Sequence, residues 1–184
     1  MKINLGKEYK RTLGIKNICY RIIWNITYIT LFRMFPTIFF NKWRIFLLKL
    51  FGAKIGKESV VYHSAKIWVP YNLEMGNKSC IGPNVNCYNV GPIKIGKCVT
   101  ISQGAYICTP THDYTDKDFK LIASQIIIND YVWITTEAFI GPKVTIGEGA
   151  IIGARAAVFK DVEAWSVVGG NPAVFLKKRY INQL

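Results

Sequence analysis

A six-residue spacing of aliphatic residues is the dominant pattern of this chain. From residue 95 the sequence reads in the frames IGKCVT, ISQGAY and ICTPTH, and from residue 128 it resumes as INDYVW, ITTEAF, IGPKVT, IGEGAI, IGARAA and VFKDVE. An earlier stretch contains the similar frames IGKESV, VYHSAK and IGPNVN. Every frame begins with Ile or Val. A repeat of this kind indicates stacked structural units.

The period of six also indicates the shape of the unit. Three strands of six residues complete one triangular turn, so the leading Ile or Val points inward and stacks on its counterpart in the next turn. The residue after it lies at or near a corner, where crowding and unusual backbone angles favour glycine. We therefore expect an all-β chain folded as a left-handed parallel β-helix of hexapeptide repeats. The unbroken run of frames from residue 128 argues against the alternating strands of a β-sandwich.

Two interruptions of the repeat predict departures from the regular helix. Extra residues enter around residues 89–92, and a longer break follows residue 112. The segment after His112, DYTDKDFKLIASQ, is polar and lacks the period of six. We expect it to form a loop extruded from one corner at about 112–125. Long loops on a regular scaffold usually carry function or form an interface.

The N-terminal segment, residues 1–51, has a different pattern. Its part from residue 15 is rich in Ile and aromatic residues, and Pro36 divides it into two expected helices. A membrane-spanning helix needs about twenty apolar residues, and the longest charge-free run, residues 22–32, is shorter. Two compatible interpretations remain: a cap over the open end of the β-helix, or an amphipathic element on an anionic membrane. The second is motivated by the aromatic residues Trp24, Tyr28, Phe32, Phe39, Phe40 and Trp43.

Charge is concentrated in the same segment. The whole chain has a net charge of +13, of which residues 1–54, with eleven basic residues and one acidic residue, contribute +10. These basic residues alternate with aliphatic ones instead of forming a polar patch. That arrangement argues against nucleic-acid binding and favours a lipid surface or a protein cap.

The five cysteines are odd in number and have no CxxC spacing, and residues 1–14 are polar with no signal-peptide pattern. We expect reduced thiols in a cytoplasmic chain, which at most contacts the inner face of the membrane. Only His63 and His112 could join the thiols, so no metal site is expected. Zinc carbonic anhydrases of the β-helical type need three histidines, and the chain has two.

Three stretches resemble one family: ISQGAYICTPTHDYTD (101–116), VWITTEAFIGPKVTIGEGAIIGA (132–154) and KDVEAWSVVGGNPAVFLKK (160–178). Together they resemble the hexapeptide-repeat acetyltransferases, most closely those of colanic acid and exopolysaccharide biosynthesis. The resemblance implies acetyl-CoA as donor, a hydroxyl or amine as acceptor, and a homotrimer with active sites between subunits. It divides the chain into a basic helical segment (1–51), a β-helix acyltransferase domain (52–170) and a tail that closes the coenzyme site (171–184).

The resemblance also implies roles for single residues. His112 matches the catalytic base, and Trp133 matches a tryptophan at the thiol end of coenzyme A. The positions matching coenzyme contacts are Thr136, Gly153, Ala154, Lys160 and Lys177. The chain departs from the common pattern along this expected groove at Thr135, Thr136, Arg155, Phe159 and Val174.

Chemistry supports a base at this point, because an alcohol is a poor nucleophile until its proton leaves. A neutral histidine suits that task near pH 7, although position alone would also allow a surface histidine without function. Asp113 and Asn89 are candidates for binding the acceptor, and Asp113 could instead cap the loop. Cys108 offers a covalent route, but no thiolate-stabilising group stands beside it.

The expected function is O-acetylation of a sugar hydroxyl in a polysaccharide precursor or other glycan, by direct transfer with His112 as general base. The alternatives are a non-catalytic β-helix scaffold and an acetyltransferase for a non-sugar or amino-group acceptor.

Overall fold

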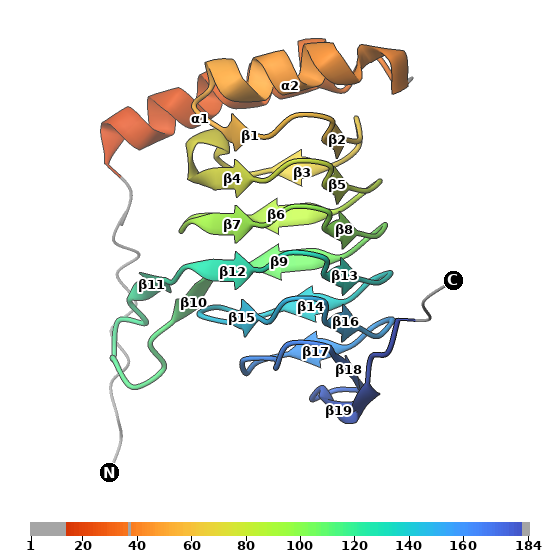
Figure 1. The fold of residues 1–184 in the computed structure, drawn as a ribbon. Coiled ribbons are helices and arrows are strands. Elements are labelled where there is room, and N and C mark those ends of the chain that lie inside the picture. Colours follow the sequence, from red (N-terminus) through yellow and green to blue (C-terminus); the bar gives the residue numbers. More distant parts are fainter. Residues whose placement is uncertain (1–13, 37, 182–184) are drawn as a thin grey trace.

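The protein is a column of stacked strands with helices laid across one end (Figure 1). The computed structural model describes residues 14–36 and 38–181; residues 1–13 of the basic segment and 182–184 of the tail lie outside the described residues. Over the described part, successive strands return to the same sheet after each turn and pair in parallel. The parallel β-helix predicted from the repeat is therefore confirmed.

The helical end consists of short elements separated near Pro36, as predicted. In chain order these are α1 (Ile15–Thr27), the π-helical turn η1 (Tyr28–Phe32), the 3-10 turn η2 (Ile38–Phe40) and α2 (Asn41–Leu50). A further 3-10 turn, η3 (Pro70–Asn72), lies in the first turn of the β-helix.

The strands of the described residues form three parallel sheets, here called faces A, B and C. Face A contains β1 (Lys54–Ile55), β4 (Leu73–Met75), β7 (Ile93–Ile95), β12 (Ile126–Ile128) and β15 (Thr145–Ile146). Face B contains β2 (Val60–Val61), β5 (Cys80–Ile81), β8 (Thr100–Ile101), β13 (Trp133–Ile134), β16 (Ile151–Ile152) and β18 (Ser166–Gly169), with β19 (Val174–Lys178) added antiparallel to β18. Face C contains β3 (Lys66–Ile67), β6 (Asn86–Tyr88), β9 (Tyr106–Cys108), β14 (Phe139–Ile140) and β17 (Ala157–Val158).

The core is made by the leading residues of the frames. Each leading Ile or Val is buried, and Ile101, Ile134 and Ile152 stack in register on face B with 0% exposure. Outside the frame that enters the hairpin, where Thr111 is exposed, the residue four places later is also buried, as at Ala105 and Ala138. One turn cannot bury its own apolar face, so the stacking of these columns holds the β-helix together.

Glycine follows the leading residue because the turns approach closely there. A Cβ on Gly96 would lie 2.3 Å from Asp130 Oδ1, and a Cβ on Gly147 would lie 2.3 Å from the backbone nitrogen of Ala164. The expectation of crowding is correct, but the expectation of unusual angles at this position is wrong. The left-handed backbone lies two residues further on, for example at Cys98 with φ 55°.

Side chains of the helical segment close the strand edges of the first turn. Asn41 accepts a hydrogen bond from the Val61 N–H (3.0 Å) and donates one to the Ser59 carbonyl (2.8 Å). Arg44, which is buried, donates from Nε to the Val61 carbonyl (2.8 Å). The Trp24 indole N–H donates to the carbonyl of Ile67 on face C (2.7 Å). The segment thus supplies the partners that an open β-helix end lacks.

Some of the aromatic residues that motivated the membrane interpretation are buried in this arrangement, and others are exposed. Trp24 and Phe32 are buried against the β-helix, so they cannot contact lipid, and this part of the expectation is wrong. Phe39, Phe40 and Trp43 are exposed. The segment therefore has an inner face that caps and an outer face that remains open.

Replacing Asn41 by Ala should lower the free energy of unfolding by about 1–3 kcal/mol, because the Val61 N–H and the Ser59 carbonyl lose their partner. Urea denaturation followed by circular dichroism measures the change. The control is Lys42→Ala, on the exposed side of α2, which should stay within about 0.5 kcal/mol of the parent. Equal stabilities of the two variants would contradict the capping role.

Candidate active site

His112 stands on a hairpin that leaves the β-helix between faces C and A. The hairpin pairs β10 (Pro110–His112) with β11 (Leu121–Ala123), which confirms the extruded loop. His112 is exposed, and its Nδ1 lies 2.6 Å from the Phe119 carbonyl oxygen. Because a carbonyl oxygen only accepts, Nδ1 carries the hydrogen and the Nε2 of the neutral ring keeps its lone pair. An imidazole in this state can accept a proton at Nε2.

Asp113 shapes the turn that follows. Its Oδ1 accepts hydrogen bonds from the backbone N–H (2.9 Å) and the hydroxyl (2.6 Å) of Thr115. The bond from the Thr115 hydroxyl, followed by the one from its backbone, holds the pKa of Asp113 below its usual value. These contacts match the loop-capping role that the sequence left open for Asp113.

Asn89 lies inside the β-helix. It is fully buried, its Oδ1 accepts from the Val69 N–H (3.1 Å), and its Nδ2 donates to the Val69 carbonyl (2.7 Å). Both ends of the amide therefore connect the first two turns. These contacts give no support to a role of Asn89 in binding the acceptor.

Trp133 and three of the expected coenzyme contacts lie along face B and the corner after it. Trp133 is 46% exposed, and its indole N–H donates to the Ser102 hydroxyl one turn earlier (2.9 Å). The Thr136 hydroxyl donates to the Gln103 carbonyl (3.1 Å), and the Thr136 carbonyl accepts from the N–H of Arg155. The backbone of residues 153–155 is thus stacked on that of Thr136. Sequence reasoning missed Ser102, which fixes the Trp133 ring.

Of the residues that depart from the family pattern, Thr135, Arg155 and Phe159 make contacts of their own. The Thr135 hydroxyl donates to a backbone carbonyl of the next turn (2.7 Å). Arg155 adopts the left-handed backbone with φ 57°, and its Nε lies 2.6 Å from Glu137 Oε2. Phe159 packs against Phe139 with ring centroids 5.6 Å apart. Val174, on β19, is exposed.

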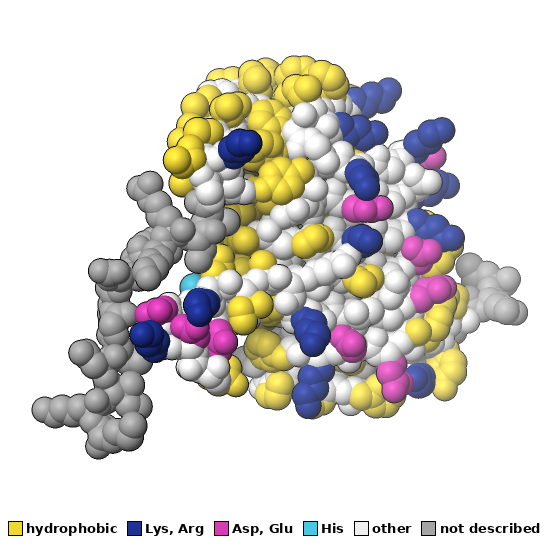
Figure 2. Space-filling model, turned by 90° about the vertical axis from the view of Figure 1, so that its left-hand side faces the viewer, with side chains coloured by type: hydrophobic (Ala, Val, Ile, Leu, Met, Phe, Trp, Pro, Cys, Tyr) yellow, Lys and Arg dark blue, Asp and Glu magenta, His cyan; other side chains and the backbone are white. Residues whose placement is uncertain are grey.

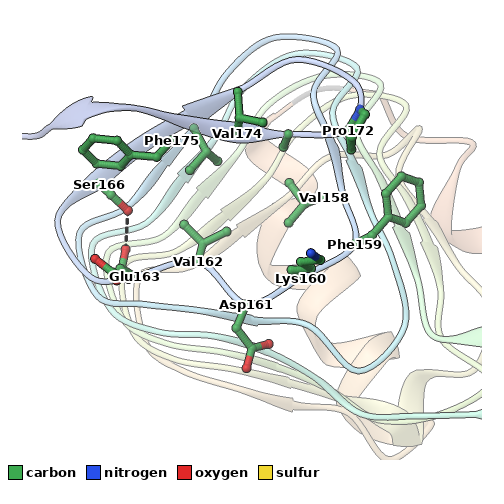
Figure 3. Close-up of a pocket in the computed structure, with 12 residues that line it drawn as sticks. Val158, Phe159, Lys160, Asp161, Val162, Glu163, Ser166, Pro172, Val174 and Phe175 are labelled. Carbon is green, nitrogen blue, oxygen red and sulfur yellow. Dashed lines mark hydrogen bonds between the residues drawn. The ribbon is translucent and has the colours of Figure 1, made fainter.

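A groove of about 400 Å³ opens at the last turn (Figure 3). Lys160 and Phe159 lie on one side of it, and Val174 and Phe175 of β19 lie on the other. Lys177 lies further along β19, is exposed, and is not among the lining residues. The structure therefore places the two expected phosphate ligands on different elements, Lys160 after face C and Lys177 at the edge of face B.

A second cavity, of about 420 Å³, lies between α1 and face C, and sequence reasoning missed it. Its walls include Trp24 and Tyr28 from the helical segment. A signal was present in the sequence, because outward aromatic residues recur about once per turn on face C. Adjacent ring centroids in this column are 4.9–6.4 Å apart, and its members are Trp68, Tyr88, Tyr106, Phe139 and Phe159.

His112 and Trp133 are on different sides of the column. The strand β10, which ends at His112, leaves the corner between faces C and A, whereas β13, which begins at Trp133, belongs to face B (Figure 1). One chain therefore does not bring the expected base beside the expected coenzyme tryptophan.

Cys108 lies between Tyr106 and the hairpin. Burial raises the pKa of its thiol, which opposes thiolate formation. Within residues 14–36 and 38–181 no group of three or more His, Cys, Asp or Glu side chains is placed to hold a metal ion. In the same described ranges no helix is long and apolar enough to cross a membrane.

The fold and the hairpin histidine define a class, the β-helical acyltransferases, and the comparisons specify the family. The chain is 43% identical over 157 residues to WcaF of Escherichia coli K12, a protein assigned to colanic acid biosynthesis as an acetyltransferase; the match covers 85% of this chain and 86% of the relative. The chain therefore belongs to the hexapeptide-repeat acetyltransferase family and is an acetyltransferase. No family model matches it.

Solved structures share the fold. A maltose O-acetyltransferase of Clostridium difficile 630 superposes with a TM-score of 0.82 at 25% identity, covering 91% of this chain and 90% of the other. A hexapeptide-repeat acetyltransferase of Vibrio cholerae O1 biovar eltor, complexed with acetyl coenzyme A, superposes with a TM-score of 0.82 at 23% identity, covering 95% and 94%. The left-handed form of the β-helix is thereby established.

Proposed function

We propose that the protein transfers the acetyl group of acetyl-CoA to a hydroxyl of a sugar, in a polysaccharide precursor or another glycan. The names of WcaF and of the maltose O-acetyltransferase support a sugar acceptor. The observation that carries the chemistry is the hydrogen bond between His112 Nδ1 and the Phe119 carbonyl, which leaves Nε2 free to accept a proton. Transfer to an amino group and a non-catalytic scaffold are the alternatives that the assays below test.

The proposed reaction is a direct transfer. The Nε2 of His112 takes the hydroxyl proton as the hydroxyl oxygen bonds to the thioester carbon. The resulting imidazolium is stabilised by its Nδ1–H bond to Phe119. When the carbon–sulfur bond breaks, the proton passes from Nε2 to the sulfur of coenzyme A. Asp113 contributes by holding the turn, and its contact with the sugar remains part of the proposal.

The site is completed between subunits. Because His112 and Trp133 lie on different sides of one chain, a second copy must bring its face B to the hairpin. A head-to-tail contact of this kind closes into a ring, and the proposed ring is a homotrimer. The pantetheine arm lies along Thr136, Gly153 and Ala154, with Lys160 and Lys177 as phosphate ligands.

The helical cap, residues 15–50, is proposed to contact an anionic membrane surface. Figure 2 shows hydrophobic side chains gathered over the helical end, with charged side chains spread over the strand turns. Residues 15–50 contain no acidic residue, and several basic ones are exposed. Apolar side chains that insert between headgroups, flanked by Lys and Arg, bind anionic membranes. The exposed apolar residues of this surface include Ile15, Ile22, Ile23, Ile26, Ile29, Met34, Phe39, Phe46 and Leu50.

His112→Ala should lower kcat by about two to four orders of magnitude, the usual effect of removing a positioned base. Coenzyme A affinity, measured by calorimetry, should change little. The matched control is Cys108→Ala, which should keep most activity because burial already disfavours its thiolate. Mass spectrometry without acceptor should find no acetylated enzyme. Near-normal turnover of His112→Ala, or an acetyl-cysteine, would rule out this mechanism.

Mixed trimers test the shared site. His112→Ala and Trp133→Ala subunits, each weakly active alone, should regain activity when co-expressed, because about one interface in four then combines a native His112 with a native Trp133. Activity per trimer after tandem affinity purification is the measurement. No gain above the two parents would show that each site belongs to one chain.

Membrane contact is tested by sedimentation with vesicles. The protein should pellet with phosphatidylglycerol vesicles and not with phosphatidylcholine vesicles, and Ile23→Asp/Ile26→Asp should abolish pelleting because both side chains are exposed on α1. Phe175→Ser, which removes an equally exposed apolar residue at the other end, is the control. Equal, negligible pelleting with both vesicle types would leave the helices with the capping role alone.

A further inference from the structure

The cavity between α1 and face C, here called the α1–face C pocket, is built on aromatic side chains. Trp68, Tyr88 and Tyr106 of face C form one wall, and Trp24 and Tyr28 of the helical cap form the other. The Trp68 and Tyr88 rings meet edge to face at 4.9 Å. The volume of about 420 Å³ falls in the range of small-ligand sites. Aromatic walls of this kind offer broad apolar faces to the C–H faces of a sugar ring.

The polar side chains that line this pocket include those of Lys66, Tyr28, Asn25 and Asn86, and its only charged lining group is a cation. Lys66 lines it, and the Arg21 guanidinium stacks 3.7 Å from the centroid of the Trp68 ring. No Asp or Glu is among the lining residues. Lys66 therefore presents a positive charge that no lining carboxylate neutralises.

Two donors lack a hydrogen-bond partner, one on Tyr28 of the lining and one on Arg21, which stacks on Trp68 of the lining. The Tyr28 hydroxyl and the Arg21 Nε are buried with no hydrogen bond to any described residue. Burial raises the pKa of Tyr28, an effect larger than the opposing influence of Arg33, so its hydroxyl stays protonated. An unpaired buried donor is costly, and a ligand rich in oxygen would relieve that cost after a small rotation of either side chain.

We infer that the α1–face C pocket binds an anionic sugar unit of the acceptor, one that carries a carboxylate or a phosphate. The inference rests on the proposed function and specifies its substrate class. The aromatic walls hold the sugar ring, and Lys66 with Arg21 holds the anion through charge-assisted hydrogen bonds. A neutral sugar would leave these two cations without an anionic partner.

The position of the pocket connects this unit to the reaction. Tyr106 begins β9, the strand that leads directly into the His112 hairpin. The opposite wall belongs to the helical cap, whose outer face is the proposed membrane surface. A glycan held here therefore lies between that surface and the base, with its next unit free to extend toward His112.

Ligand binding to the full-length protein tests the inference, with calorimetry and the fluorescence of Trp24 and Trp68 as readouts. The probes are D-glucuronic acid, D-glucose 1-phosphate, D-glucose and glycerol 3-phosphate. Both anionic sugars should bind about tenfold or more tightly than glucose, because a charged hydrogen bond is lost with the neutral sugar. Glycerol 3-phosphate, an anion without a ring, should bind more weakly than glucose 1-phosphate.

Variants assign the effect to the pocket. Lys66→Gln should remove most of the preference for the anionic sugars, and Lys66→Arg should restore it. Lys66 is exposed, so neither change threatens folding. Lys94→Gln, an equally exposed lysine on face A, is the matched control and should leave binding unchanged. Arg21→Gln is a second variant for the same measurement and should also lower the preference for the anionic sugars over glucose.

Other outcomes would overturn the inference. Equal affinity for glucose and glucuronic acid would exclude anion recognition by the pocket. If the enzyme still acetylated neutral sugars, the proposed function would stand without this inference. Glycerol 3-phosphate bound as tightly as glucose 1-phosphate, with no binding of glucuronic acid, would identify a lipid-headgroup site instead. Loss of acetyl transfer to every sugar, with anionic-sugar binding retained, would count against the proposed function and not against the pocket.

Discussion

The backbone hydrogen bonds between successive turns determine the rest of this structure. The N–H and C=O groups of each turn pair with those of the next turn, but the first turn has no turn before it to pair with. That open end must be paired. The chain pairs it with side chains: Asn41 and Arg44 at face B, and Trp24 at face C. One face of the helical segment is buried by this pairing. The opposite face stays exposed, and it is apolar and flanked by cations. Capping and the proposed membrane contact are therefore two sides of one arrangement.

The same cap creates the α1–face C pocket. Trp24 must reach the Ile67 carbonyl to close the end of face C, and it brings α1 over the outward aromatic column of that face. Arg21 on α1 and Tyr28 at the start of η1 belong to the same continuous helical stretch and are placed with it. The pocket thus arises where a structural requirement, the closure of β3, places a basic helix against aromatic side chains. Its cationic character follows from the absence of acidic residues in the cap.

The regular part of the fold could be predicted from the sequence, and the irregular part only partly. The buried column that contains Ile101 and Ile134 follows from a period that every frame repeats, so a misread residue in one frame does not change the prediction. The hairpin was predictable as a break in that period. The roles of Asn89 and Ser102 were not, because each depends on a partner in another turn, Val69 or Trp133, and local sequence does not reveal which turns touch. The reason given for the glycine positions was only partly correct. The glycine after the leading residue is needed because the next turn approaches closely, whereas the positive φ lies two residues later in the frame.

The hairpin rests on hydrogen bonds to the preceding turns, and these contacts hold the loop residue that we propose as the base. Irregular residues enter the corner between faces C and A in each of the first three turns. Asn72 donates to the Val90 carbonyl (2.6 Å), and the Gly91 N–H donates to the Thr109 hydroxyl at the foot of the hairpin (2.9 Å). Hydrogen bonds thus join each irregular corner to the one in the preceding turn, as far as the first turn, which the helices cap. The stacked corners fix the position of His112, and the Phe119 carbonyl fixes its tautomer, so the order imposed at the capped end extends to the nitrogen proposed to take the proton.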